Sequence, residues 1–546
     1  MSVDLGLTIT TRRRPFDGRP MQEVIDELTE EIGELYCADE VPWVVGYSGG
    51  KDSTAVLQLV WLALSKLAPE ARRKPVYVIS TDTLVENPVV AAWVSKSLEK
   101  MATAAEEQDL PVQPNRLTPE VKDTFWVNLI GQGYPAPRPK FRWCTERLKI
   151  RPSNSFIKRV VHNHGEAILV LGTRKAESAA RARTMEHHEK GRVRDRLSPN
   201  GSLPNSLVYS PIETWSNDDV WMFLMQVKNA WGYSNKDLLT MYQGASEDSE
   251  CPLVVDTTTP SCGDSRFGCW TCTLVDQDKS MSAMVANSED HEWMAPLLTL
   301  RDKLDGGWDG SGEDPYLQAP DEDRARAEEN DRERDARIRG ERDRQRREFR
   351  RKRGGVTVFN GRAVHGPYTQ EAREEWLRDL LRAQGEVREL GPEGTEDLEL
   401  ITLEELEEIR RIWVFDKHEI EDRVPHIYED ETGMPYPGKP LGDQIALGAD
   451  DIELLKDLCG DDPMHFEMTR SLIGVERRYQ TMARRKGLFE ELEATVRRSY
   501  FANESDALGR AKKLATVRDL RNGKTMALDL LSDEIGDGTE EHDALS

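Results

Sequence analysis

The sequence lacks any apolar run that approaches the ~20 residues needed to cross a membrane. It also lacks an apolar stretch after the arginines at positions 12–14, which a secretory leader would require. These two absences lead us to expect a cytoplasmic chain that has no membrane among its partners.

The chain also has fewer basic than acidic residues, 74 Lys and Arg against 99 Asp and Glu, which gives a formal net charge of -25. Such a charge argues against a protein that coats nucleic acid by itself, but not against binding through a local basic patch or a partner subunit. Residues 321–353 hold 11 acidic and 14 basic residues. We interpret them as a solvated helix or a tether, with a nucleic-acid contact at the basic end, 344–353, as the alternative.

Cysteine is scarce, with 7 residues in 546, too few for a disulfide framework. In a reducing compartment, clustered cysteines indicate metal or redox chemistry. Cys262, Cys269 and Cys272 stand close together and include a C-x-x-C pair, which is a strong metal signature. No histidine lies nearby, so the thiolates favour an iron–sulfur cluster, although an all-cysteine zinc site stays possible. We expect the isolated Cys37 and Cys459 to be ordinary buried residues.

What the chain does contain is an alternation of strand and helix patterns in its N-terminal part. The strand candidates are residues 41–47, 76–80 and 166–172, and helical spacing follows them over 54–67 and 88–101. Such alternation predicts an α/β fold with a mostly parallel sheet and flanking helices on both faces.

The length of 546 residues predicts two or three domains. We expect the α/β domain over 1–240, a cysteine-rich segment over 241–300, a charged linker over 301–355 and a mainly helical region over 356–546. The last region carries no chemical motif, so packing or partner docking is its expected role. Its helix candidates are 370–384, 403–415, 452–458, 470–492 and 506–521.

A glycine- and serine-rich turn joins the first strand candidate to the first helix candidate, and its sequence is Ser48-Gly49-Gly50-Lys51-Asp52-Ser53. Glycines let a phosphate approach the backbone, and the amides at the start of a helix bind the anion. Lys51 can balance phosphate charge, and the serine hydroxyls can donate hydrogen bonds. The spacing is not that of a Walker A loop. A chance glycine turn is the alternative, which the flanking strand and helix disfavour.

Polar residues also follow the other two strand candidates. Asp82 follows the second, and Arg174 follows the third, which ends at Gly172. Ligands of an open α/β sheet bind at the carboxyl ends of its strands, so we expect Asp82 near a nucleotide or its Mg²⁺, with a plain loop acid as the alternative. Arginine binds phosphate oxygens in a bidentate manner, and Arg181 and Arg183 extend the basic patch.

The loop at 48–53 resembles the SGGxDS loop of the PP-loop ATP pyrophosphatases, and Asp52 occupies the position of that family's acid. The resemblance implies cleavage of ATP between the α- and β-phosphates and adenylation of a substrate oxygen. Residues 172–178 resemble the G-x-R-x-x-E-S segment of phosphoadenylyl-sulfate reductases, which implies an arginine that faces phosphate or sulfate. Together they imply catalytic roles for Lys51, Asp52 and Arg174, and ATP contacts from Ser48, Gly49, Gly50, Lys51, Asp52, Ser53, Asp82, Gly172 and Arg174.

The segment 142–149 contains Cys144 and resembles the cysteine-bearing segment of adenylyl-sulfate reductases, which binds a [4Fe–4S] cluster together with a downstream C-x-x-C pair. The resemblance implies a cluster held by Cys144, Cys262, Cys269 and Cys272. Those reductases have two adjacent cysteines where this chain has one. Cys251 is therefore the alternative fourth ligand, or a sulfur carrier.

Taken together, the loop at 47–54, the segment at 142–145 and the cysteine motif at 266–272 resemble the DndC-like sulfurtransferases of bacterial DNA phosphorothioation. The resemblance covers roughly residues 20 to 300. It implies that ATP adenylates a DNA backbone phosphate and that sulfur then replaces a non-bridging oxygen, with release of AMP and pyrophosphate. It also implies a cysteine desulfurase as sulfur donor and the other Dnd proteins, DndD and DndE, as partners.

Three rival functions stay open. A phosphoadenylyl-sulfate or adenylyl-sulfate reductase is expected to carry a nucleophilic cysteine in a C-terminal tail, and residues 540–546 hold none. A tRNA thiolase of the PP-loop class is expected to be shorter and more basic. A non-catalytic scaffold would use the ATP loop as a switch.

Overall fold

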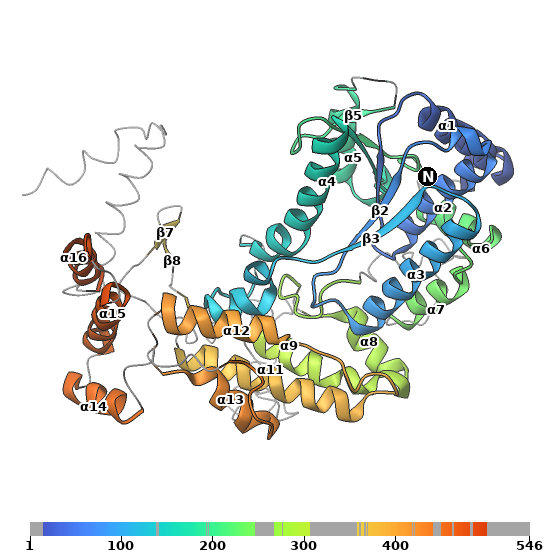
Figure 1. The fold of residues 1–546 in the computed structure, drawn as a ribbon. Coiled ribbons are helices and arrows are strands. Elements are labelled where there is room, and N and C mark those ends of the chain that lie inside the picture. Colours follow the sequence, from blue (N-terminus) through green and yellow to red (C-terminus); the bar gives the residue numbers. More distant parts are fainter. Residues whose placement is uncertain are drawn as a thin grey trace, which may run out of the picture.

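The computed structural model describes residues 15–499, with gaps in this range (Figure 1). Cys251, Cys262, the charged segment 321–353 and the helix expected over 506–521 lie outside the described residues. The gaps are 138–140, 193, 195, 246–266, 276, 306–356, 360–361, 365–366, 369, 418, 420, 440–448, 461–462 and 481–483.

A six-stranded sheet forms the centre of the N-terminal half, in the order β3-β2-β1-β4-β6-β5. The central strand β1 pairs in parallel with β2 and β4, and its first residue, Trp43, lies opposite Val76 and Ile168. Only the edge strand β5 runs antiparallel among these six. The strands are β1 (Trp43–Gly46), β2 (Val76–Thr81), β3 (Val112–Leu117), β4 (Ala167–Val170), β5 (Ser198–Pro199) and β6 (Ser206–Tyr209). The predicted mostly parallel sheet is confirmed.

Helices cover both faces of this sheet, as expected. A large apolar core joins one face to α1, α2, α3, α6 and α7, while α4 covers the other face with Phe156, Ile157 and Val160. The helices are α1 (Met21–Cys37), α2 (Lys51–Lys66), α3 (Pro88–Glu107), α4 (Arg151–His164), α5 (Ala179–Glu189), α6 (Asn217–Gln226) and α7 (Asn235–Gly244). Because β1 is enclosed by helices, Trp43, Val44 and Val45 are fully buried, and the strand is apolar throughout.

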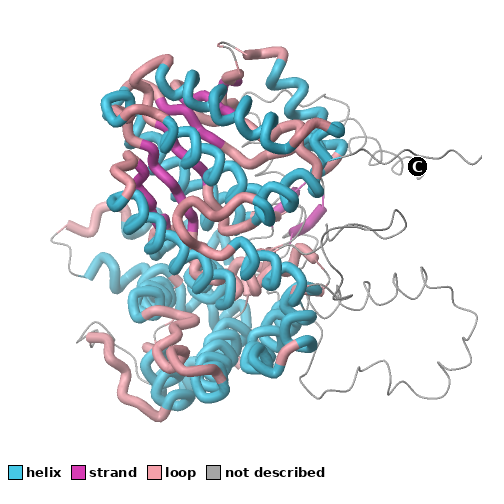
Figure 2. The backbone as a smooth tube through the Cα atoms, turned by 90° about the vertical axis from the view of Figure 1, so that its right-hand side faces the viewer, coloured by secondary structure: helices cyan, strands magenta, loops and turns pink. Residues whose placement is uncertain are grey.

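The second half of the molecule is helical, as Figure 2 shows, which confirms the predicted helical region. Its elements are α8 (Lys279–Asn287), α9 (Ala295–Asp305), α11 (Gln370–Leu390), α12 (Leu403–Arg411), α13 (Arg423–Thr432), α14 (Ala449–Cys459), α15 (Pro463–Gln480) and α16 (Leu488–Ser499), with a short hairpin of β7 (Thr357–Phe359) and β8 (Arg362–Val364). The candidate 470–492 is divided between α15 and α16, and Gly487, with φ of +92°, precedes α16.

The helices α8, α9 and α11 to α13 share a second core with residues from the N-terminal half. This core includes Trp126 and Ile130, which belong to the chain between β3 and α4, and Trp270 of the cysteine motif. The indole Nε1 of Trp413 donates a hydrogen bond to the Ile130 carbonyl at 3.0 Å, and Lys417 Nζ donates to the Gln132 carbonyl at 2.9 Å. The helices α11 to α13 are therefore packed against the rest of the chain and support it.

None of the helices among the described residues combines the length and the apolar character that crossing a bilayer requires.

The second core predicts a large effect for Trp413→Ala. The side chain is 1% exposed and lies on a π-helical turn, Ile412–Asp416, so its removal leaves a cavity and removes the hydrogen bond to the Ile130 carbonyl. We expect the free energy of unfolding in urea to fall by about 3–5 kcal/mol. Phe415→Ala on the same turn is the control, because Phe415 is 38% exposed. Equal losses for the two variants would contradict the packing described.

Candidate nucleotide and cysteine sites

The predicted site residues gather at one edge of the sheet. The glycine-rich loop follows β1, the loop with Thr83 and Glu86 follows β2, and Gly172 and Arg174 follow β4. Since these three strands are parallel neighbours, their carboxyl ends meet at this edge. The direction of strand succession reverses between β1 and β4, which is the position where open α/β sheets bind ligands.

The glycine-rich loop turns tightly between Gly46 and the first residue of α2. Gly49 has φ of +74°, and a Cβ there would lie 2.5 Å from Val94 Cγ2, so only glycine suits the position. The carbonyl of Gly50 accepts hydrogen bonds from the hydroxyls of Ser53 at 3.0 Å and Thr54 at 2.9 Å. Side-chain hydroxyls thus hold the turn that leads from the loop into α2.

The structure brings together the three residues expected to be catalytic. The Asp52 carboxylate accepts a hydrogen bond from Arg174 Nε at 2.7 Å and from Lys51 Nζ at 3.1 Å. The Arg174 side chain is 4% exposed, and its Nη1 donates to the Trp215 carbonyl at 3.2 Å. Arg174 therefore holds Asp52 in place, a role that the expectation of a phosphate-facing arginine did not include.

Gly172 is needed for contact between two loops. A Cβ at this position would lie 2.9 Å from both the carbonyl carbon and the carbonyl oxygen of Asp52. Because these are backbone atoms, α2 would have to move to accommodate a larger residue. Gly172 thus lets the loop after β4 approach the first turn of α2 and places Arg174 beside Asp52.

Asp82 lies on the other side of β2, next to β3. Its carboxylate accepts hydrogen bonds from the Leu84 amide at 2.8 Å and from Arg116 Nε at 2.9 Å, and its own amide donates to the Leu117 carbonyl at 2.8 Å. Among the described residues, no hydrogen bond or ion pair joins Asp82 to Lys51 or Asp52. The structure therefore gives Asp82 an evident role in ordering the loop after β2.

The cysteine motif docks on this same loop. The Trp270 amide donates to the Val85 carbonyl at 3.0 Å, and the Asn87 amide donates to the Gly268 carbonyl at 3.3 Å. Between these two bonds, Cys269 and Glu86 form an antiparallel bridge. The cysteine motif thus lies next to the β1 loop, because β2 and β1 are neighbours in the sheet.

Polar groups that sequence reasoning did not assign surround Cys269. Its Sγ lies 3.3 Å from Thr83 Oγ1 and 4.0 Å from Glu86 Oε1, and Lys149 Nζ lies 3.5 Å from the same Glu86 oxygen. Thr83 and Glu86 follow β2, the strand that also led to Asp82. Their position directly after a parallel strand could therefore have identified them as site candidates.

The groups of this cluster shift one another's pKa values. Burial raises the pKa of the Cys269 thiol to about 12, with a further rise from Glu86 and an opposing effect of Lys149. In turn, Cys269 raises the pKa of the Lys149 ammonium above its ordinary value. Burial also raises the pKa of Cys144, to which the charge of Cys272 adds. A thiolate in such a place needs a cation, which a metal or Lys149 can supply.

The charge of Cys272 raises the pKa of both Cys144 and Cys269, which places these three expected metal ligands in one neighbourhood. In the part of the chain that the structure describes, no group of three His, Cys, Asp or Glu side chains is arranged to hold a metal ion, and Cys262 lies outside that part. The donor set is all thiolate, which suits an iron–sulfur cluster. Arg301, 1% exposed, fixes the motif by donating to the carbonyls of Cys272, at 3.1 Å, and Val275.

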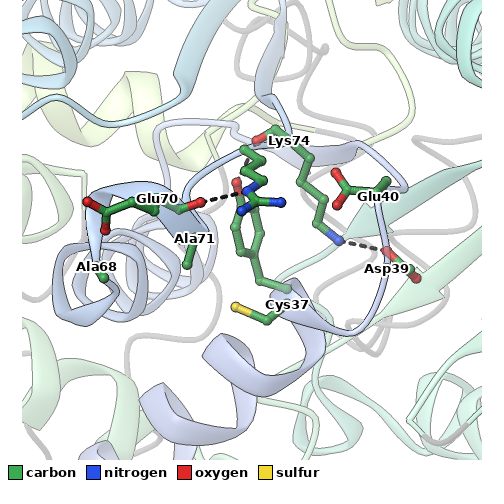
Figure 3. A pocket seen from close by; sticks show the side chains of 9 residues that line it. Cys37, Asp39, Glu40, Ala68, Glu70, Ala71 and Lys74 are labelled. Atoms are coloured by element: carbon green, nitrogen blue, oxygen red, sulfur yellow. Dashed lines mark hydrogen bonds and ion pairs between the residues drawn. The ribbon is translucent and has the colours of Figure 1, made fainter.

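A cavity of about 340 Å³ lies at the opposite edge, near the start of β1 and β2 (Figure 3). Lys74 Nζ contacts Asp39 at 2.7 Å and lies 4.9 Å from the centre of the Tyr36 ring. Burial lowers the Lys74 pKa. These contacts account for the burial of Lys74.

Cys37, at the end of α1, also lines this cavity and is exposed, which corrects our expectation of a buried residue. Cys459 is only partly buried.

The contact between Gly172 and Asp52 predicts that Gly172→Ala weakens ATP binding by at least about tenfold, because the added methyl group displaces the first turn of α2. Calorimetric titration with ATP measures this. The control is Gly201→Ala, since a Cβ at Gly201 would meet no atom within 4 Å. Unchanged affinity in Gly172→Ala would show that this contact is irrelevant to the nucleotide.

Comparisons with known proteins agree with this geometry. Residues 42–231 match the phosphoadenosine phosphosulfate reductase domain family. An uncharacterized protein of Methanocaldococcus jannaschii is 29% identical over 198 residues, which are 36% of this chain and 34% of that protein. This chain therefore spans about a third of the length of that curated relative.

Among solved structures, the U34-tRNA thiolase NcsA from Methanococcus maripaludis with its [4Fe-4S] cluster is 14% identical, and the match covers 52% of this chain and 79% of that chain. Its TM-score is 0.25, so we draw no argument from it. The family match, the sheet order and the loop after β1 agree: residues 42–231 have a PP-loop fold similar to that of the phosphoadenosine phosphosulfate reductase domain family, and the family match does not reach the helical half.

Proposed function

We propose that this chain is an ATP-dependent sulfurtransferase that phosphorothioates the DNA backbone, as the DndC-like proteins that it resembles do. The observation that supports the proposal is the adjacency of two loops. A nucleotide loop with Lys51 and Asp52 follows β1 and is joined by Arg174 from the loop after β4, and a cysteine motif docks on the loop after the neighbouring strand β2. Activation by ATP and delivery of sulfur would take place at the same edge of the sheet.

The chemistry requires two displacements at phosphorus. In the first, a non-bridging oxygen of the DNA phosphate attacks the α-phosphorus of ATP, the bond to the β-phosphate breaks, and pyrophosphate leaves. In the second, a sulfur nucleophile attacks the DNA phosphorus, and AMP leaves with the former non-bridging oxygen. A phosphate oxygen is a poor leaving group, and adenylation makes it part of AMP, which leaves more readily. Positioning and charge neutralisation are therefore the main tasks of the protein.

The residues after β1 and β4 can perform these tasks. The amides at the start of α2 would bind phosphate oxygens, and Lys51 would neutralise negative charge that develops on pyrophosphate. Arg174 holds the Asp52 carboxylate in place at 2.7 Å. Asp52 is the carboxylate that would hold Mg²⁺, because it lies in the glycine-rich loop itself, whereas Asp82 pairs with Arg116 of β3. Bound Mg²⁺ supplies further neutralisation of the phosphates.

Cys144, Cys262, Cys269 and Cys272 are the residues that would hold a [4Fe–4S] cluster, which supplies bound sulfide or a structural clamp. Lys149 and Thr83 would act on Cys269 from the protein side, the first by its charge and the second by its hydroxyl at 3.3 Å. Both effects favour the thiolate that metal ligation requires.

DNA would reach the site through local positive charge. From Arg147 to Gly165 the chain contains no Asp or Glu, and the exposed side of α4 carries Lys158 and Arg159. Arg181 and Arg183 on α5 are also exposed. With a net charge of -25 the chain alone should bind DNA weakly. We therefore include a cysteine desulfurase and the DndD and DndE proteins as proposed partners, which would deliver sulfur and hold the duplex.

Reduction of phosphoadenylyl sulfate or adenylyl sulfate is the second candidate, because the matched family bears that activity in its name. The products distinguish the two. A sulfurtransferase of the proposed kind converts ATP to AMP and pyrophosphate, whereas a reductase converts the adenylylated sulfate to sulfite at the expense of a thiol reductant. Sulfite formed by purified protein would favour the reductase.

We expect Asp52→Ala to abolish phosphorothioation in cells that also express the partner proteins, because Lys51 and Arg174 lose their shared carboxylate. Mass spectrometry of nuclease-resistant dinucleotides measures the modification. Asp457→Ala is the matched control, since it removes an exposed carboxylate from α14.

Wild-type cells without such dinucleotides, or purified protein that forms ADP rather than AMP, would contradict the proposed function.

Metal content gives a separate prediction. Protein prepared without oxygen should contain about four iron and four sulfide per chain, as a [4Fe–4S] cluster has. Cys144→Ser and Cys269→Ser should both lose most of the iron, whereas Cys37→Ser, at the opposite edge of the sheet, should retain it. Stoichiometric zinc without sulfide would exclude the cluster. If Cys251→Ser loses the iron and Cys144→Ser retains it, then Cys251 and not Cys144 is the fourth ligand.

A further inference from the structure

One tyrosine contacts the nucleotide loop from outside the loop itself. Tyr242 lies on α7 and is 7% exposed, and its hydroxyl oxygen accepts a hydrogen bond from the Lys51 amide at 3.3 Å. A Cβ on Gly50 would lie 3.1 Å from this hydroxyl, which shows how closely the tyrosine approaches the loop. The Lys51 ammonium also lies 5.7 Å from the centre of its ring. Tyr242 therefore contacts both the backbone and the side chain of the first residue of α2.

The other side of the tyrosine ring contacts the cysteine motif. Phe267 packs edge-to-face against Tyr242, with 4.8 Å between the ring centres, and Trp221 of α6 packs in the same manner at 5.1 Å. Phe267 directly precedes Gly268 and Cys269, the residues that pair with the loop after β2. The ring of Phe267 is thus held by the docking of the cysteine motif.

Phe267 also joins the two halves of the molecule. It packs against the core of the sheet, to which Tyr242 belongs, and against the second core, to which Trp270 belongs. Burial raises the pKa of Tyr242 to about 12, so its hydroxyl keeps its proton at neutral pH. A chain of direct contacts therefore runs from the Lys51 amide through Tyr242 and Phe267 to the cysteine motif.

We propose that Tyr242 is a positioning residue for ATP, and that Phe267 makes its position depend on the docked cysteine motif. Because the Lys51 amide already donates to the Tyr242 hydroxyl, Tyr242 anchors the start of α2, and a phosphate would use the amides that follow Lys51. The inference rests on the proposed function, in that it assumes ATP at the loop and a metal at the cysteines. It adds that nucleotide affinity responds to the state of the cysteine motif.

The expected effect on ATP affinity is modest, because it comes from a few local contacts. Loss of one neutral hydrogen bond changes a binding constant by about three- to tenfold. Loss of the edge-to-face contact between Tyr242 and Phe267 has an effect of similar size. A full chain with an undocked cysteine motif would release the tyrosine from one side, and the loop would bind ATP more weakly.

The test uses the full chain with its metal content measured, and the α,β-methylene analogue of ATP as the probe in calorimetric titration. Tyr242→Phe should weaken binding about three- to tenfold while iron and sulfide stay at the wild-type level. The matched control is Tyr36→Phe, because Tyr36 is 1% exposed and its hydroxyl donates to the Lys74 carbonyl at 2.6 Å, at the opposite edge of the sheet. Tyr36→Phe should lower the melting temperature without a change in affinity.

A second comparison tests the link through Phe267. Chelation of the metal from the wild type should weaken binding of the analogue, whereas Phe267→Leu should bind weakly both before and after chelation. Wild-type affinity in Tyr242→Phe would overturn the positioning role, and equal sensitivity to chelation in wild type and Phe267→Leu would overturn the link. If the wild type binds the analogue tightly, either of these two results leaves the proposed function standing. No binding to the wild type would overturn both.

Discussion

The ion pair between Arg174 and Asp52 is the interaction on which the rest of the site depends. It connects the loop after β4 to the first turn of α2, with 2.7 Å between the bonded atoms. Arg174 is almost fully buried, and an unpaired cation there would cost several kcal/mol. Gly172 permits the close approach that the pair needs, and Lys51 shares the carboxylate. The acid of the glycine-rich loop is thus held from both sides.

The cysteine motif depends on the same sheet edge but is held by different contacts. Backbone hydrogen bonds join it to the loop after β2, and Arg301 of α9 holds it from the helical half. The second core, in which Trp270 and Trp413 are buried, draws on residues from either side of the boundaries expected at 240 and 355. The C-terminal helices therefore support the cysteine motif through packing, in addition to any partner that they bind.

Sequence patterns predicted the local elements well and the pairs between them poorly. The strand at 76–80 and the helices after it follow from apolar spacing, and the loop at 48–53 follows from its glycines. The partner of Arg174 was not foreseen, because the two residues lie 122 positions apart. Asp82 was placed near the nucleotide by its position after a strand, and only the fold shows that Arg116 of β3 engages it.

The sequence by itself determined the α/β class, the glycine-rich loop and the all-thiolate character of the candidate metal site, because each depends on residue types at short spacing. Tertiary structure decided which loops are neighbours. The order β2-β1-β4 brings the cysteine motif and Arg174 to opposite sides of one loop, and no local spacing encodes a strand order. It also decided that Tyr242, an unremarkable tyrosine in the sequence, lies on the Lys51 amide, since hydrogen bonds between distant segments form only when both are packed.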